Sequence, residues 1–219
     1  MIIRVKLSNV EKCTKYANMR NRCYNEAWQD KNGKHYKGHT VCKEWLDDKQ
    51  KFYDWVDDHY YIVPFDTVDL DHNVIDLNNK IYSPSKCLFV PHEINIFFET
   101  VNARQQIKML TDGTYKVSVA STIWKDNPRL QVFDMMLENF LFDSWNHALT
   151  AFCLKKKLIK DLYLEKYRGH IPGEVFDAID RANIFTINAD LFHWDEYGTP
   201  SYIAGVDCNK LKEEIRKVS

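Results

Sequence analysis

The sequence predicts an α+β fold: an N-terminal helical segment with a strand–loop–strand–helix unit, then a small three-stranded antiparallel sheet followed by a long helix. Three patterns support this prediction. Apolar residues recur at helical spacing over residues 9–28, short apolar runs flank a polar loop between residues 68 and 90, and apolar and polar residues alternate over residues 115–121. Together they indicate helices and strands in one chain of mixed class.

Length and composition indicate a globular protein. The chain has 219 residues, of which 45% are hydrophobic and 14% aromatic, enough to bury a core in one large domain or two small ones. We expect two domains, residues 1–104 and residues 105–219. No apolar run approaches the ~18 residues of a membrane span. The start, MIIRVKLSNVEK, is too short and too charged for a signal peptide. We therefore expect a soluble intracellular protein without a membrane partner.

The cysteines give no sign of a zinc motif. They stand at positions 13, 23, 42, 87, 153 and 208 and show no CxxC or CxxH spacing. Zinc motifs need such closely spaced ligands, so none is predicted, although Cys23, Cys42 and Cys87 remain candidates to meet in space. We expect free buried thiols, which are usual in proteins that lack a secretory signal.

The net charge of −1 hides a strong partition along the chain. Residues 1–43 carry ten Lys or Arg against three Asp or Glu, and residues 44–98 carry four against eleven. A basic arm before an acidic segment suits a protein that grips phosphates with one part and holds a cation with the other. The pattern also fits two segments that attract each other across an internal interface, and both interpretations stay open.

The first helix has a clear start signal. Ser8 and Glu11 form a capping box, which predicts an amphipathic helix over residues 9–28. Its polar face is basic, and Arg20 and Arg22 are predicted to contact DNA phosphates. The alternative is that this face is only solvated.

A second helix is expected after a polar turn and loop. Asp47 or Asp48 caps it, and Phe52, Trp55 and Val56 share one of its faces. Aromatic residues at this spacing belong more often to a core than to a base-stacking surface, so we expect this face to be buried.

The stretch of residues 69–98 organises the rest of the prediction. Two short strands flank its polar loop, and a helix follows. Asp71 and His72 close the first strand, whereas His92 and Asn95 lie in the first turns of the helix. If the strands form a hairpin that packs on the helix, these side chains converge.

This order of elements, with an Asp-His pair on the first strand and Asn or His on the helix, resembles the HNH (ββα-metal) nucleases. The resemblance implies one divalent metal ion, expected to be Mg²⁺, held by Asp71, His92 and Asn95. It also implies hydrolysis of a phosphodiester bond, with His72 as general base and with Asp71 and Asn95 in the catalytic set.

The chain departs from the HNH pattern at two places. The central Asn of the motif would fall near Ile81 and Tyr82, whereas Asn78 and Asn79 lie a few residues early. Cys87 stands where many members carry Asn. Both differences concern catalysis more than fold, and they favour an inactive scaffold as the alternative.

Several motifs in order resemble bacteriophage-encoded HNH-like proteins. They are RCYN at residues 22–25, VCKEW at residues 41–45, FYDW at residues 52–55 and YSPSKCLFVP at residues 82–91. The resemblance extends over residues 16–98. It implies a homing-endonuclease-like protein in the cytoplasm of a bacterial host.

The second half is predicted to hold short strands and then a long helix. The strands are expected at residues 115–121, 129–133 and 139–142. Asp143 and Ser144 cap the helix, and Gly169 ends it. We expect Lys155, Lys156, Lys157 and Lys160 on its solvated side.

Three antiparallel strands followed by one helix, over residues 111–182, resemble the APETALA2-type DNA-binding domain. In that family the exposed face of the sheet enters the major groove of duplex DNA. The positions that would face outward here are Lys116, Ser118, Trp124, Lys125 and Arg129. DNA contact and packing against the first domain both remain open for this sheet.

These features predict a phage-type HNH homing endonuclease-like protein that binds duplex DNA and hydrolyses it with a divalent metal. The first alternative is a catalytically inactive DNA-binding or regulatory phage protein. The second is a host-directed inhibitor, which would imitate nucleic acid with its acidic segment and have a host protein as partner. No glycine-rich phosphate loop is present, so no nucleotide cofactor is expected.

Overall fold

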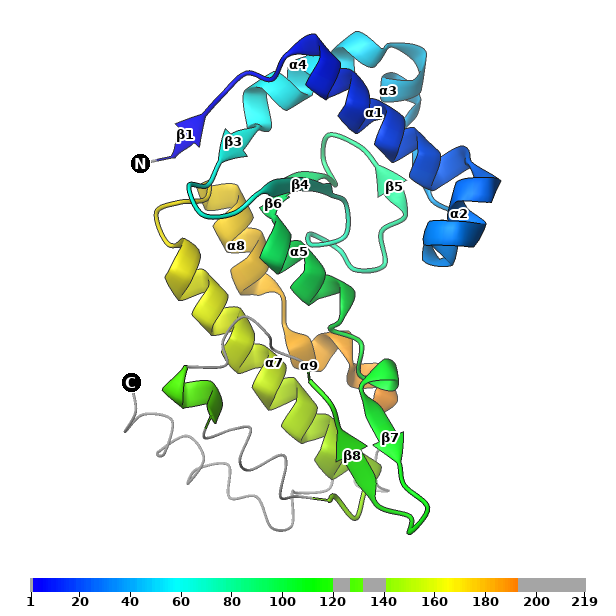
Figure 1. The fold of residues 1–219 in the computed structure, drawn as a ribbon, viewed down its shortest axis with the longest axis vertical. Coiled ribbons are helices and arrows are strands. Elements are labelled where there is room, and N and C mark those ends of the chain that lie inside the picture. The colour runs from blue at the N-terminus through cyan, green and yellow to red at the C-terminus, as the bar shows by residue number, and fades with distance from the viewer. Residues whose placement is uncertain (1, 120–126, 132–140, 193–219) are drawn as a thin grey trace. The chain divides into compact units, whose positions relative to one another are not determined.

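The computed structural model describes residues 2–119, 127–131 and 141–192. Its backbone contacts divide the chain into two compact units, each with helices and strands (Figure 1), which confirms the mixed class. The first unit joins Met1–Phe98 with Lys166–Ala182, and the second joins Glu99–Glu165 with Asn183–Ser219. We expected a boundary at residue 104, whereas the structure groups a later segment with the N-terminal one.

The helices of the first unit are α1 (Asn9–Tyr24), α2 (Glu26–Asn32), a 3-10 turn (Lys34–Tyr36), α3 (Lys43–Asp47), α4 (Lys49–His59), α5 (His92–Glu99) and α8 (Gly173–Arg181). The capping box is confirmed, because the Glu11 carboxylate accepts the Ser8 N–H at 2.8 Å and the Ser8 hydroxyl accepts the Glu11 N–H at 3.3 Å. The helix expected over residues 9–28 is divided in two. Asn25 ends α1 and caps α2 by accepting the Trp28 N–H at 3.0 Å.

The strands of the first unit are β1 (Ile3–Arg4), β2 (Thr40–Val41), β3 (Tyr61–Ile62), β4 (Val68–Asp71), β5 (Ile81–Tyr82) and β6 (Leu88–Pro91). β1 pairs with β3 and β4 pairs with β6, both antiparallel, whereas β2 pairs with β5 in parallel. α5 follows β6 directly, but the segment expected to be a loop between β4 and β6 contains a further short strand, β5, which pairs with β2.

Aromatic side chains from α3, α4 and β6 form the core of the first unit. Trp45 and Phe52 are fully buried, and their ring centroids lie 5.0 Å apart. Trp55 lies 5.2 Å from Trp45 and 5.3 Å from Phe89, measured between ring centroids. The aromatic face of the second predicted helix is therefore confirmed as core. Burial of one such ring contributes on the order of 2–3 kcal/mol.

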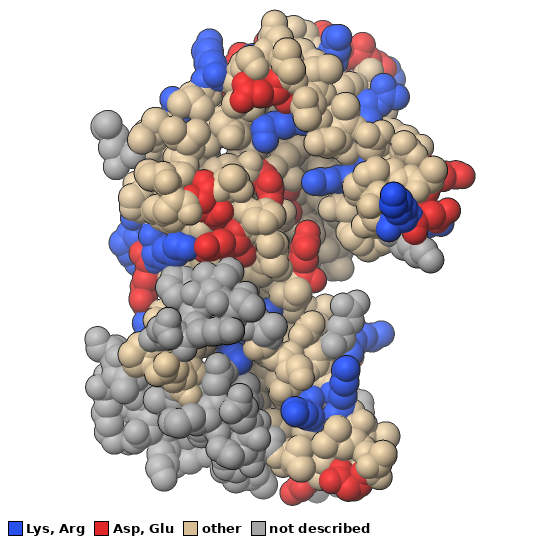
Figure 2. Space-filling view, in the orientation of Figure 1, with Lys and Arg blue, Asp and Glu red and all other residues tan. Residues whose placement is uncertain are grey.

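The basic and acidic segments contact each other inside the first unit. The Lys12 ammonium lies 2.6 Å from the Asp57 carboxylate, and both side chains are largely buried. On the face shown in Figure 2, cationic and acidic side chains are interspersed rather than gathered by sign. These observations favour the internal-interface interpretation of the charge partition.

The second unit contains a 3-10 turn (Ala103–Gln105), β7 (Ile107–Met109), β8 (Tyr115–Val117), most of α7 (Trp145–Tyr167), α9 (Ile184–Ile187) and a further 3-10 turn (Ala189–Leu191). β7 and β8 form an antiparallel hairpin. Tyr115 and Phe142 also exchange backbone hydrogen bonds, of 2.8 and 3.1 Å. In the described part of this unit, only β8 and the bridge at Phe142 fall in predicted strands, whereas β7, the partner of β8, was not predicted.

The strand expected at residues 129–133 is wrong over its described part, because residues 128–131 are helical. Asn127 accepts the N–H of Arg129 with its side chain at 3.0 Å and the N–H of Leu130 with its carbonyl at 3.0 Å. Asn before Pro128 is a helix start signal, since Asn caps the first turn and proline suits its first position. Apolar content alone led us to predict a strand here.

The predicted long helix is confirmed as α7. The Ser144 hydroxyl accepts the His147 N–H at 3.2 Å at its start, and Gly169, with a φ of +77°, follows its end. The expected solvation of its lysines is confirmed for Lys157 but wrong for Lys155, Lys156 and Lys160, which are buried. Burial lowers the pKa of Lys156 to about 8. Neither α7 nor any other helix among the described residues has the apolar length that a bilayer crossing requires.

Replacing Asn188 by alanine is expected to destabilise the second unit by about 3 kcal/mol, because three buried backbone groups lose their partner. The Asn188 amide accepts the Ala103 N–H at 2.9 Å and donates to the carbonyls of Val101 at 3.0 Å and Ile184 at 2.9 Å. Urea unfolding followed by tryptophan fluorescence measures the loss. The control is Asn102→Ala, which removes one exposed cap and is expected to cost about 1 kcal/mol. Equal losses in the two variants would show that the three buried hydrogen bonds of Asn188 do not stabilise the unit more than one exposed cap.

Candidate functional site

The pairing of β4 with β6 decides which side chains of the first strand reach the helix that follows. Asp69 lies opposite Val90, and Asp71 lies opposite Leu88. Because side chains alternate along a strand, the two aspartates share one face, away from the buried side chains of Val68 and Leu70.

Asp69 meets two side chains from the start of α5. The His92 Nδ1 atom lies 2.6 Å from the Asp69 carboxylate, and the Asn95 amide nitrogen lies 3.4 Å from the same oxygen. His92 and Asn95 are three residues apart, so they share one helix face. The His92 side chain is 49% exposed and that of Asp69 is 34% exposed. A carboxylate, an imidazole and an amide therefore meet at a half-exposed site.

The first turn of α5 is fixed by hydrogen bonds on its other side. The His92 N–H donates to the Thr67 carbonyl at 2.9 Å, and the Glu93 N–H donates to the Asp66 carboxylate at 3.2 Å. The Tyr167 hydroxyl lies 2.6 Å from Asp66 and 3.1 Å from a Glu93 carboxylate oxygen. These contacts hold the helix start rigidly beside β4, so His92 and Asn95 are positioned before any ligand binds.

A lysine from α1 adds positive charge to this site. The Lys15 ammonium lies 5.0 Å from the ring centroid of Tyr60 and 5.4 Å from that of Phe89. Burial lowers the pKa of Lys15, and the negative charge of Asp69 partly opposes this shift. The Asp69 carboxylate is therefore close enough to a cation for the two charges to influence each other.

Asp71, predicted as a metal ligand and catalytic residue, lies in the interior. One of its carboxylate oxygens accepts the N–H groups of Asn73 at 2.8 Å and Val74 at 2.7 Å, which closes the turn after β4. Burial raises the pKa of Asp71 to about 6, although these hydrogen bonds oppose the shift. The structure thus gives Asp71 a turn-forming contact and does not bring it into the contacts of Asp69.

His72, predicted as the general base, is also buried. Its ring stacks on Tyr82 with 4.2 Å between centroids and meets His39 edge to face at 4.9 Å. Burial lowers its pKa to about 3, with smaller effects from His39, Arg22 and His35. Its described contacts include neither His92 nor Asn95. For proton transfer at the surface, the geometry favours His92 over His72.

The residues predicted to contact DNA have different surroundings. Arg20 is exposed on α1, whereas the Arg22 guanidinium packs 5.4 Å from the Tyr36 ring centroid and is half-buried. Lys116 is exposed on β8. Arg129 is paired with Glu165 at 3.0 Å. Trp124 and Lys125 lie outside the described residues.

The donor types at the half-exposed site suit a hard cation. Asp69 and Asn95 offer carboxylate and amide oxygens, which are the ligands that Mg²⁺ prefers, and His92 lies beside them. Across the described ranges, no group of three or more His, Cys, Asp or Glu side chains is arranged to hold a metal ion. Fit to a divalent cation therefore depends on Asn95 as well as on Asp69.

The described cysteines are free thiols, as expected, but they differ in burial. Cys23, Cys87 and Cys153 are buried, whereas Cys13 is exposed. Burial raises the pKa of Cys87 well above its usual range, and burial raises that of Cys23 to about 11. These thiols remain protonated near neutral pH. Because the thiolate is the form that attacks and that binds metal, they are poor nucleophiles and poor metal ligands.

Comparison of the chain with protein-family models, with curated proteins and with solved structures finds no match.

Asp69 is not among the site residues predicted from the sequence. The Asp71-His72 pair carries the resemblance to the HNH nucleases, whereas Asp69 lies within the predicted strand and belongs to no motif. The signal was present, because Asp69 and Asp71 must share a face of the strand. Local sequence does not say which of the two is buried.

The stability of the first unit is expected to fall by about 2 kcal/mol from about pH 7 to about pH 5 through His72 alone. Its pKa is about 3 in the folded chain and near the usual 6.5 in the unfolded chain. The unfolded state therefore binds the extra proton as the pH falls below 6.5, which favours unfolding. The difference in urea unfolding between the unmodified chain and a His72 variant, compared at the two pH values, measures this contribution.

His72→Phe is the matched control, because it keeps an aromatic ring on Tyr82 and removes the titrating group. Asp71 contributes with the opposite sign, since its pKa is raised from 3.8 to about 6 and its stabilisation is lost as the pH rises through this interval. We expect the variant to lose no stability on acidification over the same range. The same acid-induced loss in both proteins would show that His72 is not its source.

Proposed function

We propose that this chain is an HNH-like endonuclease of the phage homing type, which binds duplex DNA and hydrolyses phosphodiester bonds with a divalent metal held by Asp69 and Asn95, beside His92. One observation supports the proposal. Asp69 of β4 contacts His92 and Asn95 at the start of α5, and this group of side chains is half-exposed. The proposal keeps the predicted helix residues and replaces the predicted Asp71-His72 pair with Asp69 and His92.

His92 is the proposed general base. If its Nδ1–H donates to Asp69, the basic lone pair is on Nε2, and the carboxylate stabilises the imidazolium that forms on protonation. His92 Nε2 then takes a proton from the water that attacks phosphorus. The half-exposed ring satisfies the requirement that the base must reach a substrate bound from solvent.

Asp69 and Asn95 are the proposed ligands of the cation, through oxygens of the carboxylate and the amide. When bound, a hard divalent ion stabilises negative charge on the phosphate. Lys15 contributes a second positive charge from α1 near Asp69 and thereby favours a phosphate at this position. Exposed Arg20 and Lys116 are the proposed contacts with DNA, since both belong to the predicted set and remain at the surface.

A catalytically inactive DNA-binding protein is the second candidate. One observation favours it: Asp71 and His72, to which the HNH resemblance assigns catalysis, are buried in a turn and an aromatic stack. In this alternative the hairpin and α5 serve only as a scaffold, and Asp69 and His92 form a structural ion pair.

Nicking of supercoiled plasmid DNA in the presence of Mg²⁺ or Mn²⁺ tests the first candidate. We expect activity in the unmodified protein and a loss of about 100-fold or more in His92→Ala, which is the usual effect of removing a general base. Asp69→Asn is expected to lose activity to a similar degree. His72→Phe serves as the control and is expected to retain activity under conditions where it stays folded.

If His72→Phe loses nicking activity and His92→Ala retains it, the general base is His72 and not His92. Absence of nicking, together with duplex binding that weakens steeply as salt rises, would support the second candidate. Absence of DNA binding at low salt would favour the host-directed inhibitor.

A further inference from the structure

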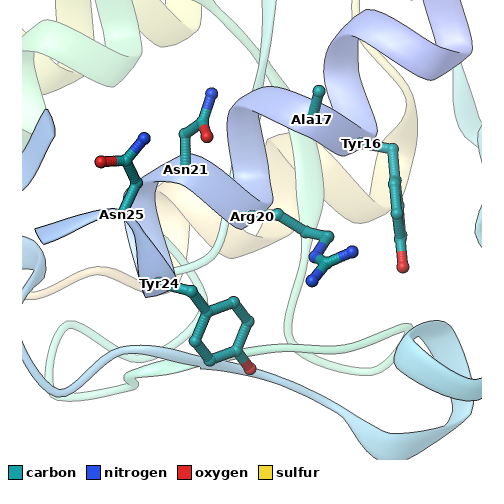
Figure 3. A pocket seen from close by; sticks show the side chains of 6 residues that line it. All are labelled: Tyr16, Ala17, Arg20, Asn21, Tyr24 and Asn25. Atoms are coloured by element: carbon teal, nitrogen blue, oxygen red, sulfur yellow. The ribbon is translucent and has the colours of Figure 1, made fainter.

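A groove of about 370 Å³ lies along α1, and Asp69 is not among the residues that line it. Its lining residues are Tyr16, Ala17, Arg20, Asn21, Tyr24 and Asn25. Tyr16, Arg20 and Tyr24 follow each other at intervals of four residues and extend to the same side of the helix (Figure 3). The volume is within the range of small-molecule sites, roughly 300–1,000 Å³.

The two tyrosine rings are held in place by their hydroxyl groups. The Tyr16 hydroxyl donates to the Trp45 carbonyl at 2.9 Å, and the Tyr24 hydroxyl accepts the Val41 N–H at 2.9 Å. Both bonds tie α1 to the backbone of the segment that contains β2 and α3. The rings therefore form fixed walls and lose little conformational freedom when a ligand binds.

Arg20 gives the groove an uncompensated positive charge. Its guanidinium lies 6.0 Å from the ring centroid of Tyr16, and no carboxylate in the described residues pairs with it. The other basic residues of α1 have internal contacts: Lys12 with Asp57, Lys15 with aromatic rings and Arg22 with Tyr36. The groove lining contains no acidic residue. An anionic ligand therefore complements it.

Tyr24 supplies an aromatic surface beside this charge. Its side chain is one of the exposed large hydrophobic groups, at 45% exposure. Asn21 and Asn25 add amide groups to the same groove. A cation, a rigid exposed ring and amides are the groups that proteins use to hold the phosphate, the base and the base edge of an unpaired nucleotide.

We propose that this groove binds a nucleotide of single-stranded DNA, with its phosphate on Arg20 and its base stacked on Tyr24. A base inside a duplex is covered on both faces by its neighbours, so stacking on a protein ring requires an unpaired strand. The inference rests on the proposed function only for DNA as the ligand, and it adds a second contact for a strand outside the duplex.

Fluorescence anisotropy with a labelled oligothymidylate of about 12 nucleotides tests the proposal. The full chain is used with EDTA, so that cleavage does not interfere. We expect Arg20→Gln to weaken binding roughly tenfold and to reduce the slope of log K against log salt by about 0.7, the value for one lost phosphate contact on a single strand. Tyr24→Leu is expected to weaken binding by roughly tenfold through lost stacking.

Two variants serve as matched controls. Tyr24→Phe keeps the ring and loses only the hydroxyl contact with Val41, so we expect binding close to that of the unmodified chain. Lys49→Gln removes one exposed positive charge from α4, outside the groove, and is expected to change the affinity by less than about twofold. Circular dichroism and thermal unfolding confirm that each variant is folded.

Loss of oligothymidylate binding in Arg20→Gln and Tyr24→Leu, with binding retained in Asp69→Asn, supports the proposal. An equal loss in Lys49→Gln would overturn it, because general charge attraction would then explain the binding. Binding of duplex DNA but not of the single strand would also overturn it, while the proposed function would stand. If neither DNA form binds, both proposals fail.

Discussion

The antiparallel register of β4 and β6 is the constraint on which the first unit depends. It places Val68 and Leu70 in the core and turns Asp69 toward the helix that begins directly after β6. Because side chains alternate along a strand, a slip of one residue would put Val68 or Leu70 in the place of the aspartates, and the contacts of both carboxylates would be lost. The positions of His92 and Asn95 follow from the same register, since α5 starts where β6 ends.

Burial distinguishes the two acid–histidine arrangements of this strand. At the end of β4, Asp71 and His72 are removed from water. Burial raises the pKa of Asp71 and lowers that of His72, and both shifts favour the neutral side chain. At the middle of the strand, Asp69 and His92 remain half-exposed and in direct contact. The same pair of residue types is therefore structural in one place and suited to proton transfer in the other.

Features determined by local sequence were predicted well. The capping box at Ser8 and the long helix after Ser144 are confirmed, because caps and helical periodicity act within a few residues. The break at Asn25 and the helix after Asn127 were missed, although both follow the known preference of Asn for helix starts. At both places the apolar pattern favours another structure, whereas the asparagine cap determines where the helix starts.

The candidate site was predicted only in part, for a physical reason. His92 and Asn95 could be placed in the first turns of a helix from the sequence, and the structure brings both beside Asp69. The choice between Asp69 and Asp71 depends on burial, which is set by segments that are distant in sequence. The same holds for Arg20 and Arg22, neighbours on one helix of which one is exposed and the other packs on Tyr36.

The Tyr167 hydroxyl between Asp66 and Glu93 has a consequence for biosynthesis. Tyr167 and α8 belong to the first unit, and α8 packs on β6, yet they are translated after most of the second unit. When only the residues up to Phe98 have left the ribosome tunnel, Tyr167 and α8 are not yet available as partners. The N-terminal unit therefore completes its packing late in translation, and until then β6 is a surface for chaperones to protect.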